Sequence, residues 1–237
     1  MIPKKIHYIW LGKVPKNKLT ELCINSWKRT MPDYEIIEWN EKSLDMVSLC
    51  NSNKFLKKCF ELKLWAFVSD YLRLLILYKE GGIYFDTDVE TVKPFDDLLD
   101  NKVFMGIEGG DYIGTAVIAS EPGNPLIKRL LDFYTDEIWQ VDFINNPIIF
   151  KYIQKNEPEQ FYNCTIYPED YFSPYTPGKN YKSTVETKQT YSIHWYTKNW
   201  NMSRKGYVFI QTKHIKNPFQ RIIATIRKNI GFYRKKN

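Results

Sequence analysis

The stretch AFVSDYLRLLILYKEGGIYFDTDVE (residues 66–90) joins a strongly apolar helical pattern to a short strand that ends in two aspartates. Residues 54–80 are helical in composition and largely apolar, so we expect one long, mostly buried helix. The Gly81-Gly82 pair ends it, because glycine adopts left-handed backbone geometry at little cost. The segment IYFD then predicts a short buried strand, which leads directly into the aspartates.

Strand and helix patterns alternate on both sides of this stretch. Further helices are predicted at residues 16–30, from Pro125 onward and after Pro218. This alternation is typical of α/β proteins, and we expect one domain over residues 1–217 followed by a separate C-terminal helix over residues 218–237. Further strands are predicted in KKIHYIWLG (4–12), YEIIEWN (34–40), KVFMGIE (102–108), YIGTAVIAS (112–120) and YSIHWY (191–196).

Composition narrows the class of protein. Of 237 residues, 43% are hydrophobic and 16% aromatic, so the chain can bury a sizeable core and is not disordered. The four cysteines form no CxxC pair, and no histidine is spaced to join them as zinc ligands. The start MIPKKIHYIWLG lacks the apolar core of a secretory signal, and no segment predicts a membrane span. We therefore expect a cytoplasmic protein.

The net charge of +7 is concentrated at the C-terminus. Residues 187–237 hold twelve Lys or Arg and no Asp or Glu, which leaves 22 basic and 27 acidic residues in the rest. A mildly acidic body with a basic end argues against nucleic acid as a partner and favours docking on anionic lipid. In PFQRIIATIRKNIGFYRKKN (218–237), apolar residues recur on one helical face: Phe219, Ile222, Ile223, Ile226, Ile230 and Tyr233.

Two interpretations of this apolar face remain open. The helix either packs its apolar stripe on the domain or lies in the interface of an anionic membrane. We favour the second and expect the protein on the inner face of the cytoplasmic membrane.

Asp86 and Asp88 are the first candidates for chemistry. Side chains at i and i+2 of an extended segment point the same way, so the two carboxylates can meet at one point. A divalent cation, Mg²⁺ or Mn²⁺, is their natural partner, and ligands in open α/β sheets bind beyond the carboxyl ends of strands. A lone DxD is also typical of a solvated turn, so the motif needs its context.

Asp70 and Arg73 provide part of that context, because residues at i and i+3 share one face of a helix. They form either an internal ion pair or a pair of contacts to sugar hydroxyls in a cleft. Trp200 lies in the polar sequence TKNWNMS, where its indole N–H is available to an anionic oxygen. Glu108 and Asp111, in GIEGGDYIG (106–114), are placed where an acceptor could approach.

Three segments together resemble a known family: IPKKIHYIWLG (2–12), residues 66–90 and HWYTKNW (194–200). They are similar to the DXD-containing sugar transferases of glycosyltransferase family 32, whose members build capsular, lipopolysaccharide and yeast outer-chain glycans. The resemblance covers most of residues 1–200. It implies a GT-A type nucleotide-sugar-binding domain with a mixed central sheet. It also implies retaining, metal-dependent transfer of a hexose or N-acetylhexosamine from a nucleotide sugar, UDP favoured, to a saccharide or lipid-linked acceptor in surface polysaccharide synthesis.

The resemblance also implies roles by position. Ile9, Trp10 and Leu11 match the segment that holds the nucleotide base, and Asp70 and Arg73 match contacts to the donor sugar. Asp86 and Asp88 match the DXD pair at ribose, Mn²⁺ or Mg²⁺ and diphosphate. His194, Asn199 and Trp200 match a segment that closes on the metal and the β-phosphate. Catalysis would thus rest on Asp86, Asp88 and Trp200, with His194 as a third metal ligand.

Two other function classes share some of these features. A haloacid-dehalogenase-like phosphatase also has an apolar strand that leads to a Mg²⁺-binding DxD. Its motif has Thr or Val two residues after the second Asp, where this chain has Glu90. A non-enzymatic module could bind polyanions or lipid through the basic tail, with a steep dependence on salt. It would leave the internal DxD and the charged Asp70 unexplained.

Overall fold

A six-stranded mixed sheet forms the centre of the molecule in a computed structural model, which describes residues 1–180, 184–197 and 202–234, without side chains for 232–234. The strand order is β2-β1-β3-β6-β5-β7. β1 is parallel to β2 and β3, β6 is antiparallel to β3 and β5, and β7 is parallel to β5. The predicted mixed α/β sheet is confirmed. The strands are β1 (Lys5–Ile9), β2 (Glu35–Trp39), β3 (Gly82–Phe85), β5 (Val103–Glu108), β6 (Tyr112–Ser120) and β7 (Cys164–Tyr167).

A second sheet pairs only two short strands, β4 (Val89–Thr91) and β8 (Ser192–His194), in antiparallel register. β8 confirms the centre of the predicted strand 191–196. Short turns of 3-10 helix lie at Asp96–Leu98, Glu137–Trp139 and Pro158–Phe161. This small sheet joins the segment after Asp88 to residues that are about a hundred positions further along the chain. The relative positions of Asp88 and His194 depend on this pairing.

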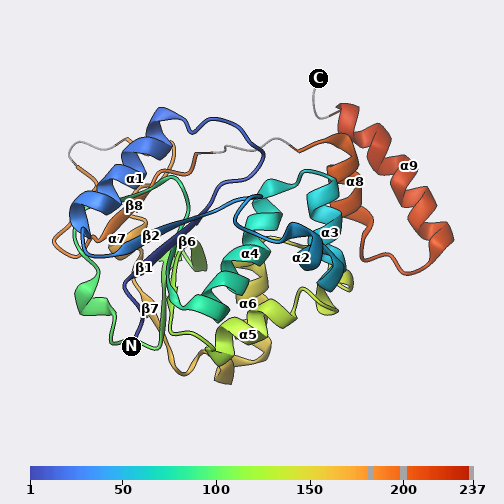
Figure 1. Cartoon of the computed structure of the whole chain (residues 1–237). Coiled ribbons are helices and arrows are strands. Elements are labelled where there is room, and N and C mark those ends of the chain that lie inside the picture. The colour runs from blue at the N-terminus through green and yellow to red at the C-terminus, as the bar shows by residue number, and fades with distance from the viewer. Residues whose placement is uncertain (181–183, 198–201, 235–237) are drawn as a thin grey trace.

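Helices cover both faces of the large sheet (Figure 1). One face carries α1, packed on Ile6 and Tyr8 of β1, whereas the other face carries α3 to α6. Ile6 and Tyr8 point to the same face because successive side chains of a strand alternate between its two faces. The helices are α1 (Lys18–Thr30), α2 (Met46–Ser52), α3 (Lys54–Glu61), α4 (Trp65–Glu80), α5 (Pro125–Asp132), α6 (Asn146–Asn156), α7 (Glu169–Phe172), α8 (Arg204–Thr212) and α9 (Pro218–Arg234).

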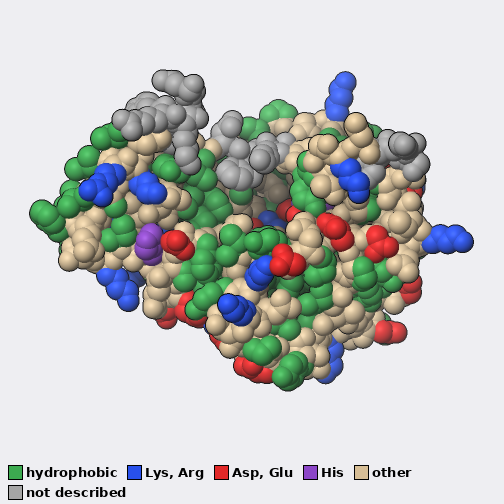
Figure 2. Space-filling model, turned by 180° about the vertical axis from the view of Figure 1, so that it is seen from behind, with side chains coloured by type: hydrophobic (Ala, Val, Ile, Leu, Met, Phe, Trp, Pro, Cys, Tyr) green, Lys and Arg blue, Asp and Glu red, His purple; other side chains and the backbone are tan. Residues whose placement is uncertain are grey.

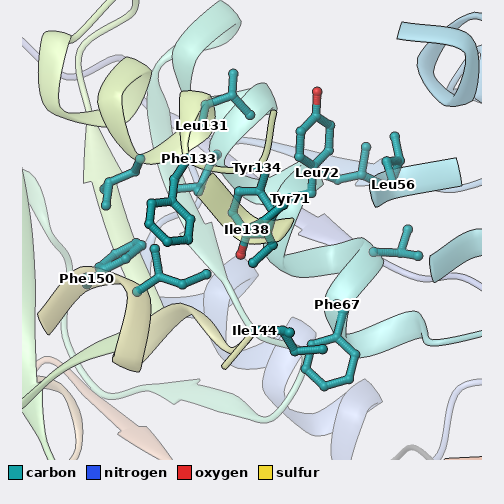
Figure 3. Close-up of a cluster of buried hydrophobic side chains, with 14 of the residues drawn as sticks. Leu56, Phe67, Tyr71, Leu72, Leu131, Phe133, Tyr134, Ile138, Ile144 and Phe150 are labelled. Atoms are coloured by element: carbon teal, nitrogen blue, oxygen red, sulfur yellow. The ribbon is translucent and has the colours of Figure 1, made fainter. Parts of the chain in front are cut away.

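The larger core lies between α4, α5 and α6, where the rings of Tyr71, Phe133, Tyr134 and Phe150 are buried among aliphatic side chains (Figure 3). The rings of Tyr71 and Tyr134 meet edge to face, with 5.7 Å between their centroids. The buried amide of Asn146 donates a hydrogen bond of 3.1 Å to the backbone oxygen of Asp70. This core therefore fixes the part of α4 that carries the charged residues.

The predicted helix over residues 54–80 is wrong at one point, because α3 ends at Glu61 and α4 begins at Trp65. Lys63, between the two helices, has a positive φ of 54°, which lies outside the right-handed helical region. Leu64 is buried against α8, where a Cβ added to Gly206 would meet its side chain at 2.6 Å. Tertiary packing thus breaks a segment that has no local break signal. The expectation that α4 is mostly buried is confirmed.

The glycine pair ends α4 as predicted, and Gly82 also permits a close approach. Gly81 and Gly82 have φ values of 64° and 93°, and a Cβ on Gly82 would lie 2.7 Å from the backbone oxygen of Lys5. Beside them, His7 Nε2 lies 2.8 Å from the Gly81 oxygen, and Trp39 Nε1 donates to His7 Nδ1 at 3.1 Å. Since Nδ1 accepts, the Nε2 atom must carry the proton and donate.

The C-terminal helices lie at one end of the molecule, with α8 beside α3 and α9 outermost (Figure 1). α9 begins at Pro218, as the sequence predicts. Within the described residues, we find no helix with the length and apolarity that crossing a bilayer requires.

Candidate active site

A cleft of about 1090 Å³ opens where the chain leaves β1 and β3. This is the edge of the sheet at which ligands bind in open α/β folds. Its lining comes from the first strand, α4, the turn after β3 and the segment after β8, which are far apart in sequence. The predicted site residues that line it are Ile9, Trp10, Leu11, Asp70, Arg73, Asp86, Asp88, Glu108 and His194.

Asp86, Asp88 and His194 converge at one point of this cleft, with one ligand atom from each within 4.8 Å of the others. The two aspartates lie on a turn rather than on the extended segment that the sequence predicts, and the Val89 N–H donates to the backbone oxygen of Asp86 at 3.0 Å. His194 arrives through the small sheet, where it is paired with Val89. The turn and the sheet together bring the three side chains into one group.

Asp88 is buried and held by the segment that follows β8. The backbone N–H and the hydroxyl of Thr197 donate to Asp88 Oδ2 at 2.7 and 2.9 Å, and His194 Nε2 lies 3.5 Å from Oδ1. Burial alone would raise the pKa of Asp88, but hydrogen bonds from His194 and Thr197 bring it below its ordinary value. Asp88 is therefore ionised and oriented before any ligand binds.

Asp86 is held from the other side by Arg73. The guanidinium lies 3.2 Å from Asp86 Oδ1 and 3.4 Å from Oδ2, and the Tyr84 hydroxyl donates to Oδ1 at 2.8 Å. Arg73 also donates to the backbone oxygen of Thr115 at 2.6 Å. Burial opposes the charge on Arg73, yet Asp86, Tyr84 and Asp70 together raise its pKa above the ordinary value. Arg73 thus remains charged and positions Asp86.

Asp70 completes the buried charge cluster on α4. Its carboxylate lies 3.1 Å from Arg73, which is the internal ion pair considered from the sequence, and both residues also line the cleft. Burial raises the pKa of Asp70 to about 6, although Arg73 pulls it down. The ion pair and the cleft position therefore coexist.

His194 has the surroundings of a metal ligand. Its Nδ1 atom is buried without a hydrogen-bond partner in the part of the chain that the structure describes, and it lies 3.6 Å from Glu108 Oε2. Burial lowers the pKa of His194, but attraction by Asp88 and Glu108 outweighs it and raises the pKa to about 10. Two carboxylates and an imidazole in this arrangement fit a divalent cation, which would take the place of the imidazolium proton.

Aromatic side chains form the end of the cleft beside β1. Trp10 Nε1 donates to the Val14 oxygen at 2.7 Å, which fixes the ring. Gly12 has a φ of 91° and lies so close to Trp65 that an added Cβ would be 3.0 Å from its indole nitrogen. Flat, partly apolar walls of this kind suit a nucleobase, whereas the carboxylate end suits a cation and phosphate groups.

Glu108 and Asp111, predicted together on the acceptor side, have different positions. Glu108 lines the cleft and also a smaller adjoining pocket of about 300 Å³. Asp111 lines neither of these two; it is exposed at the surface and forms an ion pair of 2.5 Å with Lys151. Of these two residues, Glu108 therefore lies on the cleft, and the role of Asp111 at the acceptor stays a prediction.

Two predicted residues, Asn199 and Trp200, lie outside the described residues. Sequence reasoning missed Thr197, Tyr84 and Thr115, which hold the aspartates or Arg73 in place. Tyr84 had a signal, since it lies two residues before Asp86 in the predicted strand IYFD. Thr197 had none beyond its proximity to His194.

Comparisons with known proteins agree with this geometry. Residues 18–105 match the family described as "Glycosyltransferase sugar-binding region containing DXD motif", and this range includes α4 and the DXD turn. The chain is 34% identical over 159 residues to Subversion of eukaryotic traffic protein A of Legionella pneumophila, a match that takes in 55% of this chain and 24% of that protein. It is 28% identical over 133 residues to Inositol phosphoceramide mannosyltransferase 3 of Schizosaccharomyces pombe, over 55% of this chain and 36% of that protein. The matches thus span about a quarter and a third of these relatives.

A solved structure supports the fold over nearly the whole chain. The UDP-bound glycosyltransferase domain from the YGT toxin superposes with a TM-score of 0.52 at 12% identity, over 97% of this chain and 89% of that one. This likeness concerns the fold alone. Residues 18–105 of the chain are therefore similar to the glycosyltransferase family whose sugar-binding region contains the DXD motif, and the fold is a single GT-A-like α/β domain.

Proposed function

We propose that this chain is a metal-dependent, retaining hexosyltransferase that takes a hexose or N-acetylhexosamine from a nucleotide sugar. The observation that carries the proposal is the meeting of Asp86, Asp88 and His194 within 4.8 Å, in a cleft large enough for a nucleotide sugar. The acceptor would be a saccharide or a lipid-linked saccharide in surface polysaccharide synthesis, and the reaction would take place in the cytoplasm.

The cleft offers separate environments for the parts of the donor. A Mn²⁺ or Mg²⁺ ion held by the carboxylates and His194 would neutralise the diphosphate as it leaves. Trp10 and Trp65 provide the walls for the base at the other end. Asp70 and Arg73 also line the cleft, and in this proposal they would contact the sugar. UDP is favoured because a domain of the same fold has UDP bound, whereas the mannosyltransferase relative keeps mannose among the candidate sugars.

The smaller pocket is the place for the acceptor. Glu108, Asn145, Pro147 and Tyr196 line both the pocket and the cleft, so a molecule in the pocket borders the donor site. The rings of Tyr196 and Tyr112 can stack on the apolar faces of a sugar. The acceptor hydroxyl would then lie at the junction, next to Glu108.

Retention means that the new bond forms on the face of the sugar from which the diphosphate leaves. The bond between the anomeric carbon and the diphosphate oxygen breaks, and the acceptor oxygen forms its bond on the same face. The acceptor proton goes to the departing diphosphate oxygen, which lies on that face. In this reaction, the residues of the chain would hold the carboxylates, the sugar and the acceptor in the positions that the transfer requires. Arg73 positions Asp86, and Thr197 positions Asp88.

A donor screen tests the proposal. Purified protein with Mn²⁺ should release nucleoside diphosphate from at least one of UDP-glucose, UDP-galactose, a UDP-N-acetylhexosamine or GDP-mannose, even without acceptor. Asp88→Asn should abolish this release. Asp132→Asn is a matched control, because Asp132 is an exposed carboxylate in a surface ion pair with Lys128. Absence of release with every donor, or full activity of Asp88→Asn, would contradict the proposal.

The two other function classes explain less. The mixed sheet and the matched fold are those of glycosyltransferases, so the phosphatase interpretation has no structural support. A polyanion-binding module would not need the buried cluster of Asp70, Arg73 and Asp86 at the cleft.

A further inference from the structure

α9 turns its apolar face away from the rest of the protein. Among the residues whose side chains are described, thirteen large hydrophobic ones are exposed, and five of them lie on this single helix, with exposed fractions of 39% to 74%. They are Phe219, Ile222, Ile223, Ile226 and Ile230. With about 100° of rotation per residue, these five fall within about 100° of the helix circumference. They form one continuous stripe, which we call the apolar stripe.

The opposite face of α9 packs on α8. Ala224, Thr225, Lys228 and Asn229 are partly buried, and the Lys228 ammonium donates to Gln211 of α8 at 3.0 Å. A surface helix of a globular domain normally buries its apolar face and exposes its polar one. α9 does the reverse. The interpretation in which the stripe packs on the domain is therefore wrong, since the contact uses small and polar side chains.

The charges around the stripe indicate what covers it. α9 contains no acidic residue, and residues 187–237 carry twelve basic and no acidic ones. Hydrophobic and basic side chains gather at the end of the molecule formed by α8 and α9, on the left in Figure 2. Apolar residues bordered by basic ones are the pattern of helices that lie in the plane of an anionic membrane.

We infer that α9 is an interfacial helix that docks the protein on an anionic lipid surface, with the apolar stripe in the acyl boundary and Arg221 and Arg227 near the headgroups. A second copy of the chain is a poorer occupant, because two stripes face to face would bring the same basic residues together. The inference concerns α9 alone and stands apart from the proposed transfer reaction.

Vesicle co-sedimentation of the full chain tests the inference. The protein should bind vesicles of phosphatidylcholine with phosphatidylglycerol much better than phosphatidylcholine alone. Ile222→Ser with Ile226→Ser should weaken this binding by on the order of tenfold or more. The matched control is Leu22→Ser with Val47→Ser, which makes the same kind of change at exposed positions of α1 and α2 and should bind as the wild type.

A second variant separates charge from apolar burial. Arg221→Gln with Arg227→Gln should reduce binding to the anionic vesicles and lessen its sensitivity to salt, with little effect on neutral vesicles. Circular dichroism and donor hydrolysis without vesicles should be unchanged in both α9 variants, which shows that the fold and the cleft are intact.

Three results would overturn the inference. The first is that the wild type fails to bind anionic vesicles, and the second is that Ile222→Ser with Ile226→Ser binds them like the wild type. The third is a wild-type dimer in sedimentation equilibrium that the same double variant converts to a monomer, without vesicle binding by either protein. In that case a second copy covers the stripe.

Discussion

Acidification should destabilise the fold through a single buried histidine, His7. The ring is fully buried in β1, where Nε2 donates to the Gly81 oxygen and Nδ1 accepts from Trp39. Burial lowers the pKa of His7 from 6.5 to about 4, despite the opposing effect of the hydrogen bond to Gly81. The folded state therefore holds His7 neutral at pH values at which the unfolded chain already protonates it.

The sign and size follow from linkage between protonation and folding. Between pH 6.5 and about 4, the unfolded state binds more protons than the folded state, so the free energy of unfolding falls as the pH falls. At about pH 5 the expected loss relative to about pH 7.5 is about 2 kcal/mol, and it approaches about 3 kcal/mol near pH 4. For a domain of this size, such a loss is a large part of the total stability.

Urea unfolding of the wild type and His7→Gln, followed by tryptophan fluorescence at about pH 7.5 and about pH 5, measures this contribution of His7 to the free energy of unfolding. Other groups titrate in both proteins, so the quantity of interest is the difference between their unfolding free energies. That difference should change by about 2 kcal/mol in favour of His7→Gln at the lower pH. Trp39→Phe, which removes the hydrogen bond to Nδ1 but keeps His7, should retain most of the pH dependence. A difference that is the same at both pH values would refute the reasoning.

Three further predictions concern the turn and the cleft. Gly82→Ala should cost about 2 kcal/mol or more in thermal unfolding, because strain adds to a backbone clash, whereas Gly123→Ala, at a positive φ with open space, should cost about 1 kcal/mol. Arg73→Lys should lower Mn²⁺-dependent kcat by on the order of a hundredfold, since one ammonium cannot grip both carboxylate oxygens of Asp86; unchanged kcat would contradict its positioning role. Calorimetry should show Mn²⁺ binding weakened by about tenfold in Thr197→Val and more in His194→Ala, and equal affinities in all three proteins would exclude both residues from the metal site.

Much of the fold could be predicted because local signals agree with tertiary structure there. The apolar α4, the Gly81-Gly82 stop and the strand IYFD are each read from a few neighbouring residues, and each is confirmed. The break at Lys63 could not be predicted, since it depends on packing of Leu64 against α8, which lies far along the chain.

Some residues of the candidate site could also be predicted from neighbouring sequence, whereas others could not. Asp86, Asp88, Asp70 and Arg73 are close in sequence, so their proximity was readable from helix and strand periods. The approach of His194 depends on the pairing of β4 with β8, across more than a hundred residues, and periodicity cannot encode it. The effect of His7 on stability could not be predicted from the sequence, because it arises only from the burial and the two hydrogen bonds that the fold provides.

The pairing of β4 with β8 also makes the site less stable to local unfolding than the central sheet. The two strands contribute three residues each, Val89 to Thr91 and Ser192 to His194, and they form a sheet apart from the six-stranded one. Such a small unit can open by local unfolding at a free energy below that of global unfolding. Opening would separate His194 and Thr197 from Asp88 while the central sheet stays folded. Amide hydrogens of β8 should therefore exchange with solvent faster than those of β3, and loss of metal binding should precede loss of secondary structure on heating.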